Sequence, residues 1–139
     1  MPITKDDLWI VSSTLWGECR GEPYEGKVGV ALVIRNRQTL HRRWQGMSLQ
    51  QICLAPKQFS CWNVNDPNRA YLLQLTVETP GFSECVRAML DVFVDAITSP
   101  VGDATHYYNP DAVRQTPLWA RGKIPVMQVG HHLFFKDIA

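Results

Sequence analysis

The stretch Trp16-Gly-Glu-Cys-Arg-Gly-Glu-Pro-Tyr-Glu-Gly-Lys27 organises the rest of the chain. It holds three carboxylates within eight residues: Glu18, Glu22 and Glu25. Three glycines and one proline interrupt it. Gly21 suits the left-handed position after a helix end, and Pro23 suits the start of the next helix. The stretch therefore predicts two helices joined by a turn, with Glu18 at the end of the first.

Glu18 continues an apolar helical stripe. Leu8, Val11 and Leu15 lie at i, i+3 and i+7, on one side of the first predicted helix. The next position on this stripe is Glu18, so we expect its carboxyl group to be partly desolvated. Burial disfavours the charged form and raises a carboxyl pKa, as a general acid working near neutral pH requires. A structural glutamate that accepts hydrogen bonds from the turn explains the pattern equally well.

The composition is that of an ordinary soluble globular protein. The 139 residues are 45% hydrophobic and 19% charged, which predicts a single domain over residues 1–139. The formal net charge is +1 and the basic cluster His41-Arg-Arg43 is short, so we expect no binding to nucleic acid or membranes. No apolar run approaches the length of a membrane span. The N-terminus lacks the pattern of a signal peptide, which predicts synthesis in the cytoplasm.

The cysteines do not indicate a metal site. None of the four forms a Cys-x-x-Cys pair: Cys19, Cys53, Cys61 and Cys85. Cytoplasmic synthesis favours free thiols that pack as small hydrophobic side chains, with a Cys53–Cys61 disulfide as the alternative. Because a His-Glu-x-x-His motif is also missing, the sequence predicts neither a metal nor another cofactor.

The hydrophobic pattern predicts about five helices. They are expected over residues 5–20, 25–40, 49–55, 69–78 and 83–97. The second is apolar on most sides and belongs at the centre of the domain, and its Gly29 and Ala31 leave room for a close neighbour. The last helix carries the clearest stripe predicted to face the core: Val86, Met89, Leu90, Phe93 and Ile97.

Short aromatic strands follow the helices. Residues 105–110 predict a strand that ends in a turn, and residues 128–135 predict a final strand. Residues 57–62 predict a short strand or loop. One hairpin is not stable alone in water, so the two aromatic strands must pack against the helices. The fold class is therefore α+β, mostly helical with a small β element on one side.

Four separated segments carry a further signal. They are residues 16–27, Lys57-Gln-Phe-Ser60, Tyr107-Tyr-Asn-Pro110 and Val129-Gly-His-His-Leu-Phe134. In this order they resemble the SleB/CwlJ family of cell wall hydrolases, which includes spore cortex-lytic enzymes and phage or prophage lysis proteins. The resemblance runs from about Leu8 to Phe135. It implies a lysozyme-like fold whose β element lines a glycan cleft.

The resemblance also implies an activity on peptidoglycan, which would be the binding partner. The family cleaves the β-1,4 bond between N-acetylmuramic acid and N-acetylglucosamine. Its catalytic acid is the first Glu of Gly-Glu-x-Arg-Gly-Glu, which is Glu18 here. Cys19 stands where Ala is common, and Thr105-His106 stands where apolar or aromatic residues are usual. These departures, with no separate wall-binding domain or signal peptide, favour a monomeric phage or prophage endolysin that reaches the wall after release during lysis.

The number of available acids bears on the reaction. Hydrolases pair the acid with a second carboxylate. The two carboxyl groups are about 5 Å apart in enzymes that retain the configuration at the anomeric carbon, and farther apart in enzymes that invert it. In a lytic transglycosylase the muramic 6-hydroxyl attacks its own C1, and one Glu serves as both acid and base. One well-placed acid favours the transglycosylase, with Glu18 as general acid/base. Glu22 is assigned a supporting role, fixing the turn through a backbone N–H or Arg20, and a muramidase that uses it as the second carboxylate is the alternative.

The other motif segments predict the substrate-binding residues. They are Gln58, Phe59, Ser60, Trp62, Tyr108, Asn109, Trp119 and His132. Amide and hydroxyl groups would bind acetamido groups or orient Glu18, and aromatic rings would stack on sugar faces. Purely structural roles remain open, for Phe59, Asn109, Trp119 and His132 in particular.

Two other functions stay open. A zinc amidase would use His106, His131 or His132, although neighbouring histidines in a strand point to opposite faces. A non-catalytic glycan-binding module would keep the aromatic residues and would not need Glu18. The substitution Glu18→Gln separates these functions, because a binding module would keep its function and an enzyme of the predicted kind would not.

Overall fold

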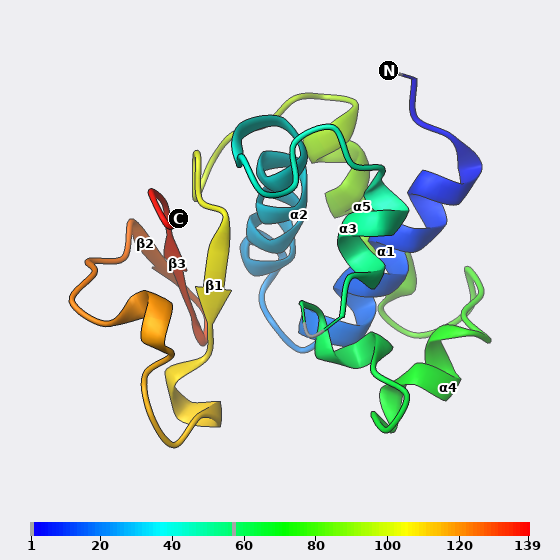
Figure 1. Cartoon of the computed structure of the whole chain (residues 1–139). Coiled ribbons are helices and arrows are strands. Elements are labelled where there is room, and N and C mark those ends of the chain that lie inside the picture. Colours follow the sequence, from blue (N-terminus) through cyan, green and yellow to red (C-terminus); the bar gives the residue numbers. More distant parts are fainter. Residues whose placement is uncertain (1, 57) are drawn as a thin grey trace.

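The computed structural model describes residues 2–56 and 58–139. A helical body lies beside a small sheet (Figure 1). The body contains five α-helices: α1 (Lys5–Cys19), α2 (Tyr24–Leu40), α3 (Leu49–Leu54), α4 (Asn68–Leu72) and α5 (Phe82–Phe93). The sheet contains three strands: β1 (His106–Tyr108), β2 (Met127–Val129) and β3 (His132–Phe135). Within the described part of the chain, no helix has the length and apolarity needed to cross a membrane.

The predicted helix starts are confirmed where a side chain caps the helix. Asp7 N donates to Thr4 Oγ1 at 3.1 Å, and Thr4 N donates to Asp7 Oδ2 at 3.0 Å. Ser48 and Gln51 form the same reciprocal pair at the start of α3. These capping boxes satisfy backbone amides that have no partner inside the helix.

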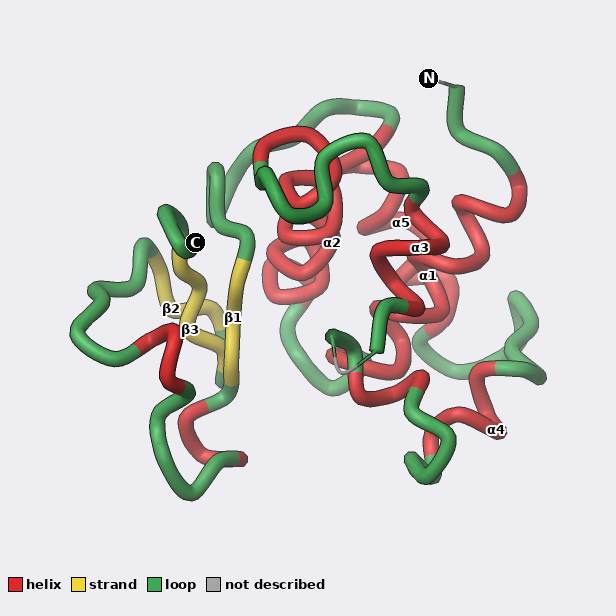
Figure 2. The backbone as a smooth tube through the Cα atoms, viewed as in Figure 1, coloured by secondary structure: helices red, strands yellow, loops and turns green. Residues whose placement is uncertain are grey.

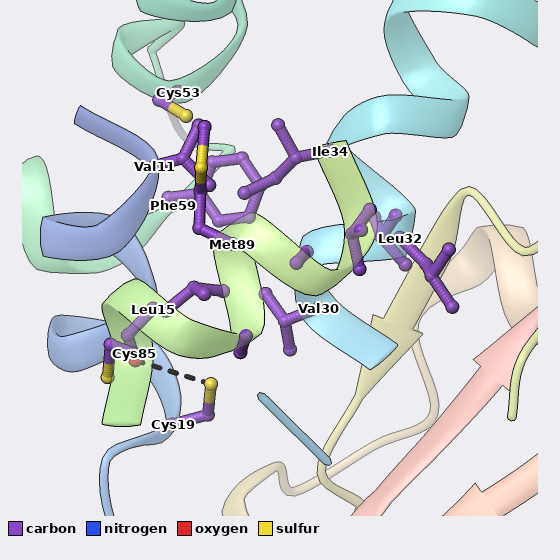
Figure 3. Packing of buried hydrophobic residues seen from close by; sticks show 14 of the residues in the cluster. Val11, Leu15, Cys19, Val30, Leu32, Ile34, Cys53, Phe59, Cys85 and Met89 are labelled. Atoms are coloured by element: carbon purple, nitrogen blue, oxygen red, sulfur yellow. Dashed lines mark hydrogen bonds between the residues drawn. The ribbon is translucent and has the colours of Figure 1, made fainter. Parts of the chain in front are cut away.

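Helix α2 is the central element, as its composition predicts. It contacts α1, α3 and α5 on one side, and the strands β1 and β2 on the other. Figure 3 shows the core between the helices, where Val30 and Ile34 of α2 meet Leu15 of α1 and Met89 of α5. All four cysteines are buried free thiols, so the alternative Cys53–Cys61 disulfide is not formed.

The sheet is antiparallel with the order β1-β3-β2 (Figure 2). The expected pairing of the two aromatic strands is confirmed, and Tyr107 lies opposite Phe134. The prediction of one continuous strand over residues 128–135 is wrong. Gly130 has a φ of +57°, a conformation that suits glycine, and this turn divides the segment into β2 and β3.

Polar side chains of α2 anchor the chain that leads into β1. Asn36 Nδ2 donates to the carbonyl oxygens of Gly102 and Ala104 at 2.7 and 2.9 Å. Arg37 Nε donates to Thr105 O at 2.8 Å. Because the bonds to Ala104 O and Thr105 O are buried, they fix where the strand begins relative to the central helix.

Three predicted elements differ from the structure. Helix α4 is much shorter than residues 69–78, because Thr76 and Thr79 side chains accept backbone N–H bonds in a local turn. Helix α5 ends at Phe93, and Ala96 has a φ of 57°. Residues Ser60–Trp62 form a 3-10 turn where a strand or loop was expected, and Lys57 lies outside the described residues.

The predicted core stripe of α5 is consequently only partly correct. Met89 is fully buried, whereas Leu90 and Ile97 are 39% and 38% exposed. The buried face is rotated and consists of Phe82, Cys85, Ala88, Met89 and Val92.

The contact between α2 and β3 generates a stability prediction. A Cβ added at Gly29 would lie 2.8 Å from Cζ of the buried Phe134 ring. Although Gly→Ala within a helix normally stabilises it, we expect Gly29→Ala to lower the free energy of unfolding by about 1–3 kcal/mol. Urea titration measures this change. The loss should shrink in a Phe134→Leu background, and a stabilised Gly29→Ala protein would contradict the predicted packing.

Candidate active site

Two distant segments hold the carboxylate of Glu18, which lies in the last turn of α1. Its Oε2 accepts a hydrogen bond from the backbone N–H of Cys61 at 3.2 Å. Its Oε1 accepts one from the hydroxyl of Tyr107 at 3.0 Å. A Cβ at Gly17 would lie 2.7 Å from Cys61 Cβ, so the glycine before the acid permits this close approach.

The surroundings of Glu18 confirm the expected desolvation. Burial raises the pKa of its carboxyl group, and the hydrogen bonds from Cys61 and Tyr107 lower that pKa in part. The pKa remains raised on balance. The protonated form is therefore more populated near neutral pH than in an exposed glutamate, which is the state that a proton donor needs.

Tyr107 is the contact that sequence reasoning missed. Burial raises the pKa of its phenol well above the ordinary value, so it stays a donor to Glu18. The neighbouring Tyr108 stacks on Phe135, with ring centroids 5.8 Å apart, and packs against Trp119. Alternation along β1 places the two tyrosines on opposite faces of the sheet. That alternation was the available signal, but it does not say which face meets α1.

An open cleft of about 380 Å³ lies over this acid. Its lining consists of Gly17, Glu18, Cys19, Arg20, Gly21, Glu22, Asn68, Asn109 and His132. The structure thus brings together four of the predicted site residues: Glu18, Glu22, Asn109 and His132. A larger hollow of about 680 Å³ lies between residues 40–43 and the C-terminal residues 137–139, and it contains none of them.

Glu22 is bound to the turn between β2 and β3. Its Oε1 accepts the backbone N–H of His131 at 2.7 Å, and its Oε2 lies 2.8 Å from His131 Nδ1. Burial raises the pKa of Glu22, but the hydrogen bonds from His131 outweigh burial and leave that pKa lowered. Of the two expected partners of Glu22, a backbone N–H is found, that of His131, whereas Arg20 is not, because its guanidinium donates to Trp16 O and Asn68 Oδ1.

Several predicted binding residues lie outside the cleft. Phe59 is 1% exposed, so the expected stacking on a sugar is wrong. Trp62 Nε1 donates to Thr14 Oγ1 on α1, and Trp119 packs against His106 and Phe135.

Gln58 and Ser60 do not orient the acid. Gln58 Oε1 accepts from Arg37, and Ser60 is an exposed residue of the turn that supplies the Cys61 N–H. Tyr108 also lies outside the cleft, because it belongs to the cluster around Phe135.

The sequence profile of the family described as Cell Wall Hydrolase matches residues 21–135. This chain belongs to that family. Spore cortex-lytic enzymes of Oceanobacillus iheyensis and Bacillus cereus are 31% and 32% identical to it, each over 96% of this chain. The alignments cover 42% and 45% of those relatives, so the chain spans less than half of their length.

Solved structures share the fold. One is the catalytic domain of the germination-specific lytic transglycosylase SleB from Bacillus anthracis, with a TM-score of 0.74, 28% identity and 96% coverage of both chains. The catalytic domain of Bacillus cereus SleB gives a TM-score of 0.76 at 27% identity, over 97% of this chain and 93% of that one. The resemblance to the SleB/CwlJ family and the α+β lysozyme-like fold are confirmed.

The histidines of this cell wall hydrolase form two separate pairs, His41 with His106 and His131 with His132. His106 packs among His41, Trp44 and Trp119. His131 and His132 both approach Glu22, which differs from the expected opposite faces because His131 belongs to the turn. Across residues 2–56 and 58–139, no three His, Cys, Asp or Glu side chains are grouped closely enough to hold a metal ion.

The hydrogen bond from Tyr107 predicts a measurable effect on Glu18. Tyr107→Phe removes a donor that lowers the pKa of the carboxyl group, so that pKa should rise further above its usual range. A ¹³C NMR titration of the Glu18 carboxyl carbon measures it. Tyr108→Phe is the matched control and should leave the pKa unchanged, because Tyr108 does not contact the acid. An unaltered pKa in Tyr107→Phe would contradict the assigned hydrogen bond.

Proposed function

We propose that the protein is a lytic transglycosylase that cleaves the β-1,4 bond between N-acetylmuramic acid and N-acetylglucosamine in peptidoglycan. The observation that carries this proposal is the setting of Glu18, a partly buried carboxyl with a raised pKa that borders an open cleft. Membership of the cell wall hydrolase family and the names of the relatives support peptidoglycan as the substrate. The chain would act as one catalytic domain and as a monomer.

One residue would serve both proton transfers. Protonated Glu18 donates to the glycosidic oxygen as the bond to C1 of the muramic residue breaks. The resulting carboxylate then accepts the proton of the 6-hydroxyl as that oxygen attacks C1, which gives a 1,6-anhydro product and restores the acid. Between the two steps, Cys61 N–H and Tyr107 OH stabilise the carboxylate. Burial raises the pKa of Glu18 and these donors lower it, so the carboxyl group can both give and take up a proton during the reaction.

A hydrolytic muramidase is the second candidate function, because Glu22 offers a second carboxylate. It lines the same cleft, and a lowered pKa keeps it ionised, as a second carboxylate requires. However, His131 engages both of its oxygen atoms. A carboxylate held in this way is a weak base for activating water, and this favours the transglycosylase.

Asn109 and His132 are the proposed substrate-binding residues. Asn109 Oδ1 accepts a hydrogen bond from Asp111 N, so the side-chain amide nitrogen of Asn109 would be the atom that donates to a glycan. Both residues line the cleft on the side of the sheet, across from Arg20 and Asn68.

Mass spectrometry of muropeptides tests the reaction. Purified peptidoglycan treated with the wild-type protein should release fragments that end in 1,6-anhydromuramic acid. Glu18→Gln cannot donate a proton, so it should release them at least about a hundredfold more slowly.

The alternatives give different products. Fragments with reducing muramic acid ends would identify a hydrolase, and Glu22 would then be the candidate second carboxylate. Cleaved peptides on intact glycan, or full activity of Glu18→Gln, would overturn the proposal.

We also propose that the protein is a phage or prophage endolysin. The resemblance of its motifs to lysis proteins supports this role. A culture that expresses the protein in the cytoplasm should keep its optical density until chloroform permeabilises the inner membrane, and should then clear rapidly. The same culture expressing Glu18→Gln should not clear. Lysis without permeabilisation would contradict release-dependent action.

A further inference from the structure

His132 borders the cleft, and one of its ring nitrogens is buried. The residue is 7% exposed and begins β3. Its Nδ1 is buried, has no hydrogen-bond partner in the described part of the chain, and lies 3.8 Å from Glu22 Oε1. This distance is too long for a hydrogen bond, but it is short enough for a strong electrostatic influence.

The carboxylate of Glu22 discriminates between the two neutral forms of the ring. A neutral imidazole carries a proton on one nitrogen and a lone pair on the other. A lone pair on Nδ1 would face the negative charge of Glu22 and be repelled, whereas an N–H there is attracted. The proton is therefore held on Nδ1, and Nε2 is left as an acceptor.

The neighbouring groups keep the ring neutral and in place. Burial lowers the pKa of His132, Glu22 raises it, and His131 lowers it, with a lowered value as the result. The Tyr107 ring packs against His132 with centroids 4.8 Å apart. His131 in turn fixes Glu22 through its backbone N–H and Nδ1.

The orientation of the ring decides which atom meets a ligand. Because Nδ1 is buried next to Glu22, Nε2 is the ring nitrogen of His132 that is left for a ligand in the cleft. No hydrogen bond to Nε2 occurs among residues 2–56 and 58–139. The acceptor is thus available on the wall of the cleft that also contains Glu18.

We infer that His132 Nε2 accepts a hydrogen bond from a hydroxyl or acetamido N–H of the bound glycan. Glu22 is a positioning residue that fixes the ring tautomer required for this contact. The inference rests on the proposed glycan substrate, and it explains a second cleft carboxylate that takes no part in the chemistry.

Two substitutions at His132 separate the roles of its nitrogens. The amide of Gln reaches approximately the position of Nε2, and the amide of Asn reaches approximately that of Nδ1. Binding of soluble glycan strands is measured by calorimetry in a Glu18→Gln background, where neither cleavage nor titration of Glu18 interferes. His132→Asn should weaken binding about tenfold, the value of one hydrogen bond, and His132→Gln should weaken it less. Equal or reversed losses would overturn the inference.

The pH dependence of binding tests the role of Glu22. Protonated His132 has no acceptor, so affinity should fall as the pH drops through its pKa, below about 6.5. Glu22→Gln removes the negative charge that raises this pKa and should move the loss of affinity to lower pH. If Glu22 had only a structural role, Glu22→Gln would not change the pH at which glycan affinity is lost. That result would contradict its assigned role as a positioning residue.

The tautomer itself can be observed in the wild-type protein. ¹⁵N NMR of His132 at neutral pH should show a protonated Nδ1 and an unprotonated Nε2. The opposite tautomer would overturn the inference even if every variant failed to fold. If the wild-type protein does not cleave peptidoglycan, the proposed function fails. If it cleaves peptidoglycan and His132→Asn binds glycan normally, only this inference fails.

Discussion

The rest of the site depends on the hydrogen bonds that the partly buried carboxylate of Glu18 needs. Its two donors come from positions 43 and 89 residues further along the chain, so they meet only in the folded protein. Gly17 allows the segment around Cys61 to come close, and the bonds from Asn36 and Arg37 hold the start of β1. A buried acid without such partners would destabilise the fold. The same hydrogen bonds stabilise the ionised form of Glu18 enough for its carboxyl group to give up a proton.

The cleft contains two carboxylates whose surroundings act in opposite directions. Burial dominates at Glu18 and raises its pKa, whereas hydrogen bonds from His131 dominate at Glu22 and lower its pKa. Two groups of the same chemical type, four residues apart, thereby have pKa values that are shifted in opposite directions. This divergence is the physical basis for treating one as the proton donor and the other as a fixed negative charge that orients a neighbouring ring.

Local chemistry explains where the fold was predictable. The capped starts of α1 and α3 and the start of α2 after Pro23 depend on residues within a few positions of each other. The left-handed conformation predicted for Gly21 is wrong, because α1 ends through Arg20 in the right-handed region and Gly21 has no positive φ. The errors arose where a short-range bond or a backbone conformation overrode periodicity. Thr76 and Thr79 shorten α4, and the positive φ of Gly130 splits the final strand. Hydrophobic periodicity does not register either effect.

By itself, the sequence determined the place of Glu18 on the core-facing side of α1, the central position of α2 and the family to which the chain belongs. These features depend on residue type and local spacing. Only the tertiary structure decided which tyrosine meets Glu18, that Phe59 is core, and that His131 holds Glu22. Alternation along β1 separates Tyr107 from Tyr108 without saying which face is covered. The packing of the sheet against α2 makes that choice, because Gly29 accommodates the Phe134 ring there.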